Sequence, residues 1–555
     1  MTPIRKARPK WAEPLTLFLI LTLTLPLVYH FARIGFDPHH AGLMYKSALD
    51  VANGAHLFSE TFTQYGALVT WMQALSLLVL GKQVTSILFC TALFYALSFA
   101  MLYLVSRRFL GPWLSLTATV TTVFLAAFYF WDFHPWSSVY ALFFLLLSLY
   151  LSLLALDRTG WRFLLLTALS GLCAALVFWC RQPAGLVAIL AGLICFGLPA
   201  VLLRRYTQRR MLYGLLLFVA GAAAGLLLLF IPIAATGATA DFVTQSIGGM
   251  FSFLNDRSYA ESRGIFFSIG LIFANLLTLP SMRTDLFPVL NVMWSLLPLA
   301  AVGLTVFAVV RIRLAIKKED GEEGKALLPT LFYGVFAACA WHQYYPVACF
   351  RHWYWGAFLC VPAALLCLRG LVDWLAHFER LAWLRPERRR LCAFALAAAL
   401  LLAPNACTRV GLGIEKTVKT ADRIPFESED YAHLNDLYLS PEVADHYREL
   451  FAVIADLRER YPDRNVVNLT ENGIYAVFGE NFHPMFNNAG DFYYDDYPAA
   501  KDAYIAAARP ILIGTDGVPE DYVLYYVPVG FSGDQWEDTH RMPPYVYIPP
   551  ELMEN

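Results

Sequence analysis

Residues 36–82 read FDPHHAGLMYKSALDVANGAHLFSETFTQYGALVTWMQALSLLVLGK. Two segments of this stretch, 41–52 and 66–80, carry apolar residues at helical spacing, and Gly54 lies between them. Each segment is too short or too amphipathic to cross a bilayer comfortably. We therefore expect two helices that lie at the membrane interface, within a loop that begins at about residue 35. The alternative, in which 66–80 crosses the membrane, inverts the side of every later loop.

The composition of the 555-residue chain indicates a membrane protein. Hydrophobic residues make up 58% of the sequence, charged residues only 15%, and the mean hydropathy is +0.51. Soluble proteins carry about 25% charged and about 45–50% apolar residues. This excess excludes a soluble enzyme, a disordered chain and a disulfide scaffold. The ten cysteines all lie at or before Cys407 without zinc-like spacing, so we expect most of them to be buried small hydrophobic residues.

Apolar runs of about 18–24 residues recur through the first 406 residues, long enough to cross a hydrocarbon core about 30 Å thick as helices. The first run, from Glu13 to Ile34, is too long for a signal peptide and is expected to be a span. Ten further spans are centred on Phe94, Phe124, Leu146, Leu169, Ala191, Ala224, Leu299, Phe336, Ala363 and Ala398. The apolar region 266–279 is expected to be interfacial or re-entrant, because counting it as a span puts the basic loop 311–325 on the outer side. The sequence therefore predicts about eleven transmembrane helices.

Basic residues gather in the loops on one side of these predicted spans. That side holds the N-terminus and the loops at 107–108, 158–162, 204–210, 311–325 and 385–390. The positive-inside rule makes it the cytoplasmic side, and an odd number of spans puts the C-terminal tail on the other. We therefore expect a multi-pass protein of a bacterial inner membrane, with a cytoplasmic N-terminus and a periplasmic C-terminal domain.

The tail differs from the rest of the chain in charge. Residues after Thr408 hold 26 acidic and 11 basic side chains, a net charge of −15, whereas the remainder holds 17 and 31, a net charge of +14. We divide the chain into a transmembrane domain, 1–407, and an acidic extracytoplasmic domain, 408–555. Within the tail, we expect a helix at 442–461 and strands at 466–469, 511–514, 522–529 and 545–548. The tail is therefore predicted to be a small α/β domain on the outer side.

Asp37 is the first candidate for chemistry, because it lies just past the outer end of the first predicted span. A carboxylate there is shielded by neighbouring loops yet reachable from lipid and water, as a general base acting on a lipid-bound substrate requires. Alternatively, Asp37 caps the helix that follows Pro38. His39 and His40 come next, and a divalent metal site with Asp37 is conceivable. We assign no metal or other cofactor, since adjacent histidines rarely bind one ion together.

This loop resembles the first outer loop of the GT-C superfamily, the polyprenyl-phosphate-sugar-dependent membrane glycosyltransferases. It is most similar to the protein-mannosyltransferase and aminoarabinose-transferase branch. The resemblance is carried by the span that ends at Asp37, the Tyr45 helix, Gly54 followed by Leu57-Phe58, and the helix from Tyr65 to Leu80-Gly81. It implies that Asp37 sits at the catalytic centre. Two features depart from the family: His39 and His40 stand where a second acid often does, and Gly66-Ala67 replaces the usual proline pair.

Two further polar residues fit the same family pattern at the outer ends of spans. Asp132, within Trp131–Trp136, is expected to be a second catalytic acid, and Arg181 is expected to bind the donor phosphate, since a guanidinium binds its oxygens bidentately. The alternatives are an interfacial loop with a tryptophan belt for Asp132 and a snorkelling arginine for Arg181.

A third constellation lies at 341–355, where His342, Arg351 and His352 are surrounded by aromatic residues. A site that binds phosphate through basic side chains and stacks sugar rings on aromatic ones would use these residue types. An aromatic belt with snorkelling bases is the alternative.

These features favour a glycosyltransferase that moves a sugar from a polyprenyl-phosphate carrier to an extracytoplasmic acceptor, a lipid, glycan or protein, with inversion. Asp37 is expected to act as base, and Arg181 and Arg351 to stabilise the phosphate leaving group. The predicted substrate-binding residues are His39, His40, Arg181, His342, Arg351 and His352. A glycolipid transporter or flippase and a non-catalytic accessory subunit of a glycan assembly system remain alternatives. The bilayer is the expected environment, and nucleic acid is not an expected partner.

Overall fold

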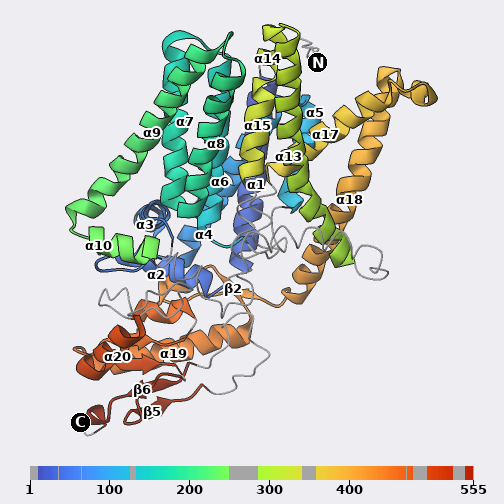
Figure 1. The fold of residues 1–555 in the computed structure, drawn as a ribbon. Coiled ribbons are helices and arrows are strands. Elements are labelled where there is room, and N and C mark those ends of the chain that lie inside the picture. Colours follow the sequence, from blue (N-terminus) through green and yellow to red (C-terminus); the bar gives the residue numbers. More distant parts are fainter. Residues whose placement is uncertain are drawn as a thin grey trace.

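The computed structural model describes residues 11–34, 37–63, 65–125, 133–248, 286–340, 358–429, 431–470, 472–478, 497–514, 516–528 and 544–553. A bundle of long helices forms one part, and a small domain with a β-sheet lies beyond one end of it (Figure 1). The predicted fold class, a polytopic helical membrane protein with a small C-terminal α/β domain, is confirmed.

Each of the eleven predicted spans falls on a helix of the described chain. These helices are α1 (Ala12–Ile34), α4 (Val84–Ser106), α5 (Pro112–Leu125), α6 (Ser137–Leu156), α7 (Gly160–Cys180), α8 (Gln182–Leu202), α9 (Gln208–Ala235), α13 (Leu286–Lys317), α15 (Leu328–Cys339), α17 (Cys360–Leu375) and α18 (Glu387–Lys419). Shorter elements connect them: α10 (Thr239–Phe242), the π-helix η1 (Val243–Gly248), α14 (Gly321–Ala326) and the 3₁₀-helix η4 (Glu379–Leu384). Within the described residues, seven helices are long and apolar enough to cross a membrane. The region 266–279 lies outside the described residues.

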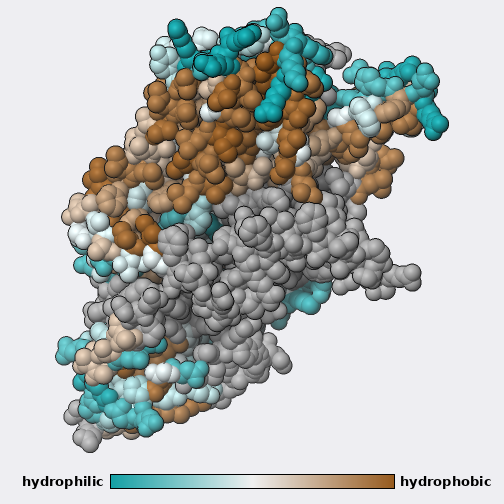
Figure 2. Space-filling view, viewed as in Figure 1, coloured by the Kyte–Doolittle hydropathy of each residue, from teal (hydrophilic) through white to brown (hydrophobic). Residues whose placement is uncertain are grey.

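The surface of the bundle matches a lipid environment. Apolar side chains of α9 such as Leu216, Leu227 and Ile231 are at least 60% exposed. Figure 2 shows an apolar surface over the bundle, with a hydrophilic cap at the end away from the C-terminal domain. A soluble protein rarely exposes so continuous an apolar surface.

Ion pairs and hydrogen bonds bring the basic loops together at this capped end. Arg107 lies 3.8 Å from Glu13 at the start of α1, and Arg108 pairs with Asp157 after α6. Arg210, at the start of α9, donates at 2.7–3.1 Å to three carbonyl oxygens, two at the end of α6 and one in the loop between α6 and α7. The predicted grouping of these loops on one side therefore agrees with their contacts.

Small residues let α7 and α9 approach closely, as is common between helices in membranes. A Cβ atom at Gly171 of α7 would lie 2.0 Å from the carbonyl oxygen of Phe218, and one at Gly221 of α9 would lie 1.9 Å from that of Ala168. Neither position therefore has room for a side chain.

The two interfacial helices are α2 (His40–Ala52) and α3 (Ala67–Leu80), and they follow the predicted segments closely. With 14 residues, α3 is about 21 Å long, too short to cross a core of about 30 Å. Gly54, between them, has a φ of +104°, a conformation that glycine adopts without steric cost.

The C-terminal domain contains a four-stranded sheet in the order β3-β4-β6-β5. Its strands are β3 (Val466–Asn468), β4 (Ile511–Ile513), β5 (Val523–Tyr526) and β6 (Val546–Ile548), all within the predicted segments. β3 and β4 are parallel, and the other pairs are antiparallel. The helix predicted at 442–461 is α19 (Pro441–Arg460), which begins after the Ser440 cap. The sequence did not predict α20 (Tyr497–Ala508), the small pair β1 (Ile424–Pro425) and β2 (Tyr438–Leu439), or the 3₁₀-helices η5 (Ala432–Leu434), η6 (Gly473–Phe478) and η9 (Pro550–Leu552).

α18 continues without a break from Glu387 to Lys419. The predicted boundary between residues 407 and 408 therefore falls inside this helix, and the division into two domains stays a prediction.

Candidate active site

Asp37 lies between α1 and α2, and its carboxylate is held by the residues that follow it. Oδ1 accepts the backbone N–H of His39 at 3.0 Å, and Oδ2 lies 2.7 Å from Nδ1 of His40. A carboxylate only accepts, so Nδ1 of His40 is the donor in this hydrogen bond. The side chain of Asp37 is only 11% exposed. The chain thus presents a nearly buried carboxylate whose charge is compensated by two donors.

The loop before α6 brings a second histidine to the same carboxylate. Nδ1 of His134 lies 3.9 Å from Oδ2 of Asp37. The rings of His40 and His134 both lie 5.3 Å from the ring of Trp136. We call Asp37, His40, His134 and Trp136 the Asp37 cluster. Sequence reasoning singled out 131–136 for its acid and missed His134 and Trp136; the histidine and tryptophan of that motif were the available signal.

Arg181 occupies the tight turn between α7 and α8. Its Nη1 donates to Oγ of Ser138, in the first turn of α6 and two residues after Trp136. The start of α6 therefore connects Arg181 to the side of the bundle where the Asp37 cluster lies. His39, His40 and Arg181 thus lie at the same end of the bundle, and their roles in substrate binding stay predictions.

Gly66, where related loops carry a proline, packs directly on this turn. Its N–H donates to the carbonyl oxygen of Cys180 at 3.1 Å. A Cβ atom at Gly66 would lie 2.0 Å from the carbonyl oxygen of Trp179. Glycine at this position therefore lets the start of α3 approach the end of α7.

The C-terminal domain contacts the same segment. The N–H of Gly473, the first residue of η6, donates to the carbonyl oxygen of Pro38 at 3.0 Å. A Cβ atom at Gly42 of α2 would lie 2.6 Å from the backbone nitrogen of Ile474. The hydroxyl of Tyr45 donates to the carbonyl oxygen of Lys82 at 2.7 Å and lies 2.6 Å from Nδ1 of His433, whose pKa is lowered by burial.

A buried polar network holds η6 in place on the domain side. Asn468, Thr470 and Asn472 are at most 1% exposed. Asn468 donates to the carbonyl oxygen of Asn472 at 2.8 Å, and Asn472 donates to the hydroxyl of Tyr447 at 3.0 Å. The N–H of Ile474 in η6 donates to Oδ1 of Asn472 at 3.0 Å, so this buried network links η6 to the end of β3.

A buried ion pair on α2 was not anticipated. Lys46 pairs with Asp50, and the hydroxyl of Thr61 donates to the other carboxylate oxygen at 2.9 Å. Burial raises the pKa of Asp50, and the attraction of Lys46 opposes this shift. The pair lies within α2, and the hydrogen bond from Thr61 ties α2 to the chain that leads into α3.

Four predicted site residues, Asp132, His342, Arg351 and His352, lie outside the described residues and stay predictions. Within the described ranges, no group of three His, Cys, Asp or Glu side chains is arranged to hold a metal ion.

The cluster combines a carboxylate with two imidazoles beside an indole ring. A carboxylate oxygen can accept a hydrogen bond from a substrate hydroxyl. The arrangement is suited to accepting a proton from such a hydroxyl.

The chain resembles known proteins in part of its sequence and in its fold. Residues 66–244 match the family described as dolichyl-phosphate-mannose-protein mannosyltransferase. The fold resembles that of ArnT from Cupriavidus metallidurans in the apo state, with a TM-score of 0.51, 11% identity, and coverage of 96% of this chain and 98% of that chain. It also resembles the archaeal oligosaccharyltransferase AglB from Archaeoglobus fulgidus, in complex with an inhibitory peptide and a dolichol-phosphate, with a TM-score of 0.50, 11% identity, and coverage of 91% and 70%. No curated protein sequence matches the chain. Residues 66–244 thus match a mannosyltransferase family, and the fold of the chain is similar to the folds of ArnT and AglB.

Proposed function

We propose that the chain transfers a sugar from a polyprenyl-phosphate carrier to an acceptor on the outer side of a bacterial inner membrane, the acceptor being a lipid, glycan or protein. The name of the matching family contains a dolichyl-phosphate sugar, and the AglB structure contains a dolichol-phosphate. The observation that carries the proposal here is the Asp37 cluster, a carboxylate with two imidazoles at the outer end of the bundle.

In the proposed reaction Asp37 takes the proton of the acceptor hydroxyl. The acceptor oxygen attacks the anomeric carbon, the bond from that carbon to the phosphate oxygen breaks, and polyprenyl phosphate leaves. A single displacement inverts the anomeric configuration. His40 and His134 orient the carboxylate, and His39 holds its other oxygen through the backbone. Arg181 stabilises negative charge on the leaving phosphate.

The side of the membrane follows from charge. The basic loops that gather at one end of the bundle are placed in the cytoplasm by the positive-inside rule. The Asp37 cluster and the acidic domain are at the other end, which supports a reaction on the outer side. A lipid carrier suits this location because its headgroup reaches an outer site from within the bilayer.

The experiment uses the purified full-length protein in nanodiscs with a radiolabelled polyprenyl-phosphate sugar and an acceptor extract from cells that lack the protein. Wild-type protein is expected to release polyprenyl phosphate only when the extract is present, and Asp37→Asn to lower the rate about 10²–10⁴-fold, as removal of a general base does. Movement of the labelled lipid between leaflets, with no bond cleavage, would support a flippase. If the protein shows neither activity, the remaining interpretation is a non-catalytic accessory subunit.

A further inference from the structure

Arg33, in the last turn of α1 and four residues before Asp37, stacks on two tyrosine rings. Its guanidinium carbon lies 4.6 Å from the ring centre of Tyr29 and 5.2 Å from that of Tyr438. Tyr29 is one turn earlier on α1, whereas Tyr438 belongs to β2 of the C-terminal domain. A guanidinium that stacks in this way uses its faces and keeps the N–H groups at its edge for other partners.

The edge of this guanidinium has no protein partner within the part of the chain that the structure describes. No described carboxylate forms an ion pair with Arg33, and its buried Nε–H has no hydrogen-bond acceptor there. The residue as a whole is partly exposed, so a ligand can approach it from the surface. A basic residue in the last turn of a helix complements the helix dipole. That effect explains the positive charge but satisfies none of the N–H groups.

Arg33 lies on the face of α1 that is exposed at the surface of the bundle. Leu15, Leu19 and Leu23 on this helix are 44–67% exposed. Arg33 follows Leu15 by 18 residues, which is five full turns of 3.6 residues, so both side chains leave the helix on the same side. In a membrane this face contacts lipid.

The length of α1 places Arg33 at the level of lipid headgroups. Glu13, in the first turn of α1, lies 3.8 Å from Arg107 at the capped end of the bundle. Arg33 follows Glu13 by 20 residues, and a helical rise of about 1.5 Å per residue makes this distance about 30 Å. The hydrocarbon core of a bilayer has the same thickness. A helix that places Glu13 at one headgroup level therefore places Arg33 at the other.

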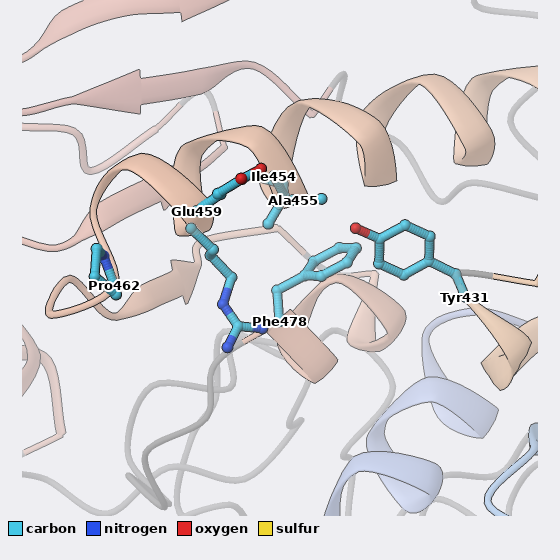
Figure 3. Close-up of a pocket in the computed structure, with 7 residues that line it drawn as sticks. Tyr431, Ile454, Ala455, Glu459, Pro462 and Phe478 are labelled. Atoms are coloured by element: carbon cyan, nitrogen blue, oxygen red, sulfur yellow. The ribbon is translucent and has the colours of Figure 1, made fainter.

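The elements on both sides of Arg33 are held in place. Nη1 of Arg423 donates to the carbonyl oxygen of Ile34, the last residue of α1, at 2.6 Å. Tyr431, in the segment between β1 and β2, has its ring 6.2 Å from that of Phe478, and Figure 3 shows it pointing toward Phe478 beneath α19. The hairpin that carries Tyr438 is thus attached to the body of the C-terminal domain.

We propose that Arg33 binds the phosphate of a phospholipid in the leaflet on the side of the C-terminal domain, and that this lipid helps to hold the domain on α1. A guanidinium edge binds two phosphate oxygens bidentately. The phosphate of the sugar donor is assigned to Arg181, in the turn between α7 and α8, whereas Arg33 faces the bulk lipid, in which phospholipids are the abundant phosphates. The inference goes beyond the proposed function and does not depend on it.

The test uses purified full-length protein in detergent and measures lipid binding by native mass spectrometry, without sugar donor or acceptor. The probe is phosphatidylglycerol, and diacylglycerol with the same acyl chains is the matching lipid without phosphate. Arg33→Gln removes the charge, and Arg33→Lys keeps the charge but not the planar fork of donors. Lys419→Gln, which removes an exposed cation at the end of α18, is the matched control.

Arg33→Gln is expected to lower the affinity for phosphatidylglycerol at least about five-fold, as the loss of one basic residue near a membrane surface predicts. Arg33→Lys is expected to lower it about two-fold or more, because an ammonium group cannot bind phosphate bidentately. Lys419→Gln should bind phosphatidylglycerol as wild-type protein does, and all four proteins should bind diacylglycerol equally.

The proposal is wrong if either Arg33 variant binds phosphatidylglycerol as wild-type protein does, or if Lys419→Gln lowers the affinity as much as Arg33→Gln. A parallel loss of diacylglycerol binding would contradict it too, because the phosphate would then play no part. Two further results would overturn it. If only the binding of decaprenyl phosphate depends on Arg33, this residue belongs to the donor site. If an excess of inorganic phosphate displaces phosphatidylglycerol, the site is one for free anions.

Discussion

At the scale of single residues, two imidazoles that face one carboxylate characterise this site. His40 donates to Oδ2 of Asp37 at 2.7 Å, and His134 approaches the same oxygen at 3.9 Å. A second carboxylate in that place would repel Asp37, whereas an imidazole fixes its orientation. In the proposed mechanism the histidines therefore act through the position of the carboxylate.

His40→Gln is expected to lower kcat about 10–100-fold, the usual effect of removing a residue that orients a reactive group. KM for the donor should change little, because the substitution leaves Arg181 in place. The steady-state assay with labelled donor measures both constants. His56→Gln, an exposed histidine of the same loop, is the matched control. An equal fall in kcat for both variants would contradict the orienting role of His40.

His446 is expected to make the C-terminal domain less stable in acid. His446 is 8% exposed and lies 3.1 Å from the hydroxyl of Tyr475, and burial lowers its pKa to about 4. The unfolded chain binds a proton near pH 6.5, but the folded chain does not. The contribution of neutral His446 to the free energy of unfolding is therefore fully present above pH 6.5. It falls by on the order of 3 kcal/mol as the pH falls toward 4.

His446→Gln keeps a hydrogen-bonding group but does not titrate. The apparent melting temperature of the full-length variant in detergent is expected to fall less between pH 7 and pH 4.5 than that of wild-type protein. Differential scanning fluorimetry measures both. Identical pH profiles for the two proteins would assign the acid sensitivity to other groups.

At the scale of elements, the sequence predicted which segments are helices or strands but not how they meet. Apolar length and loop charge were sufficient for the bundle helices, and turn residues for β3 to β6. The short η6 was missed because six residues carry no periodic signal. The approach of His134 to Asp37 was missed because it depends on packing between segments about 100 residues apart, which no local pattern encodes.

The contact between η6 and α2 provides a test of this packing. A Cβ atom at Gly473 would lie 2.3 Å from the backbone nitrogen of Leu43, so Gly473→Ala is expected to weaken the contact by about 1–3 kcal/mol. Faster proteolytic release of the C-terminal domain and lower transferase activity should follow. Gly111→Ala, where a Cβ meets nothing within 4 Å, is the control. Unchanged proteolysis of Gly473→Ala would show that η6 does not anchor the domain.

At the scale of the whole molecule, opposite charge on the two parts of the chain indicates opposite sides of the membrane. The basic loops meet through Arg107, Arg108 and Arg210 at one end of the bundle, and the acidic domain lies beyond the other end (Figure 1). The sequence predicted this separation because the net charge and the hydropathy of a segment are sums over its residues. It did not predict the site geometry, which depends on individual contacts.

The orientation is expected to be N-terminus inside and C-terminal domain outside. Single-cysteine variants in a cysteine-free background test this orientation. One cysteine replaces Ser428, between β1 and β2, and the other replaces Arg205, in a basic loop. A membrane-impermeant maleimide applied to intact spheroplasts should label Ser428→Cys, and should label Arg205→Cys only after lysis. The reverse pattern would invert the topology and place the Asp37 cluster in the cytoplasm.

The central claim is that the chain transfers a sugar at Asp37. The most direct measurement is a glycolipid and surface-glycan profile of cells with wild-type protein, with Asp37→Asn, and without the protein, at matched expression and membrane insertion. The account predicts that one glycan loses a single sugar in the null and in Asp37→Asn alike, while the polyprenyl-phosphate sugar accumulates. A wild-type profile for Asp37→Asn beside an altered profile for the null would contradict it.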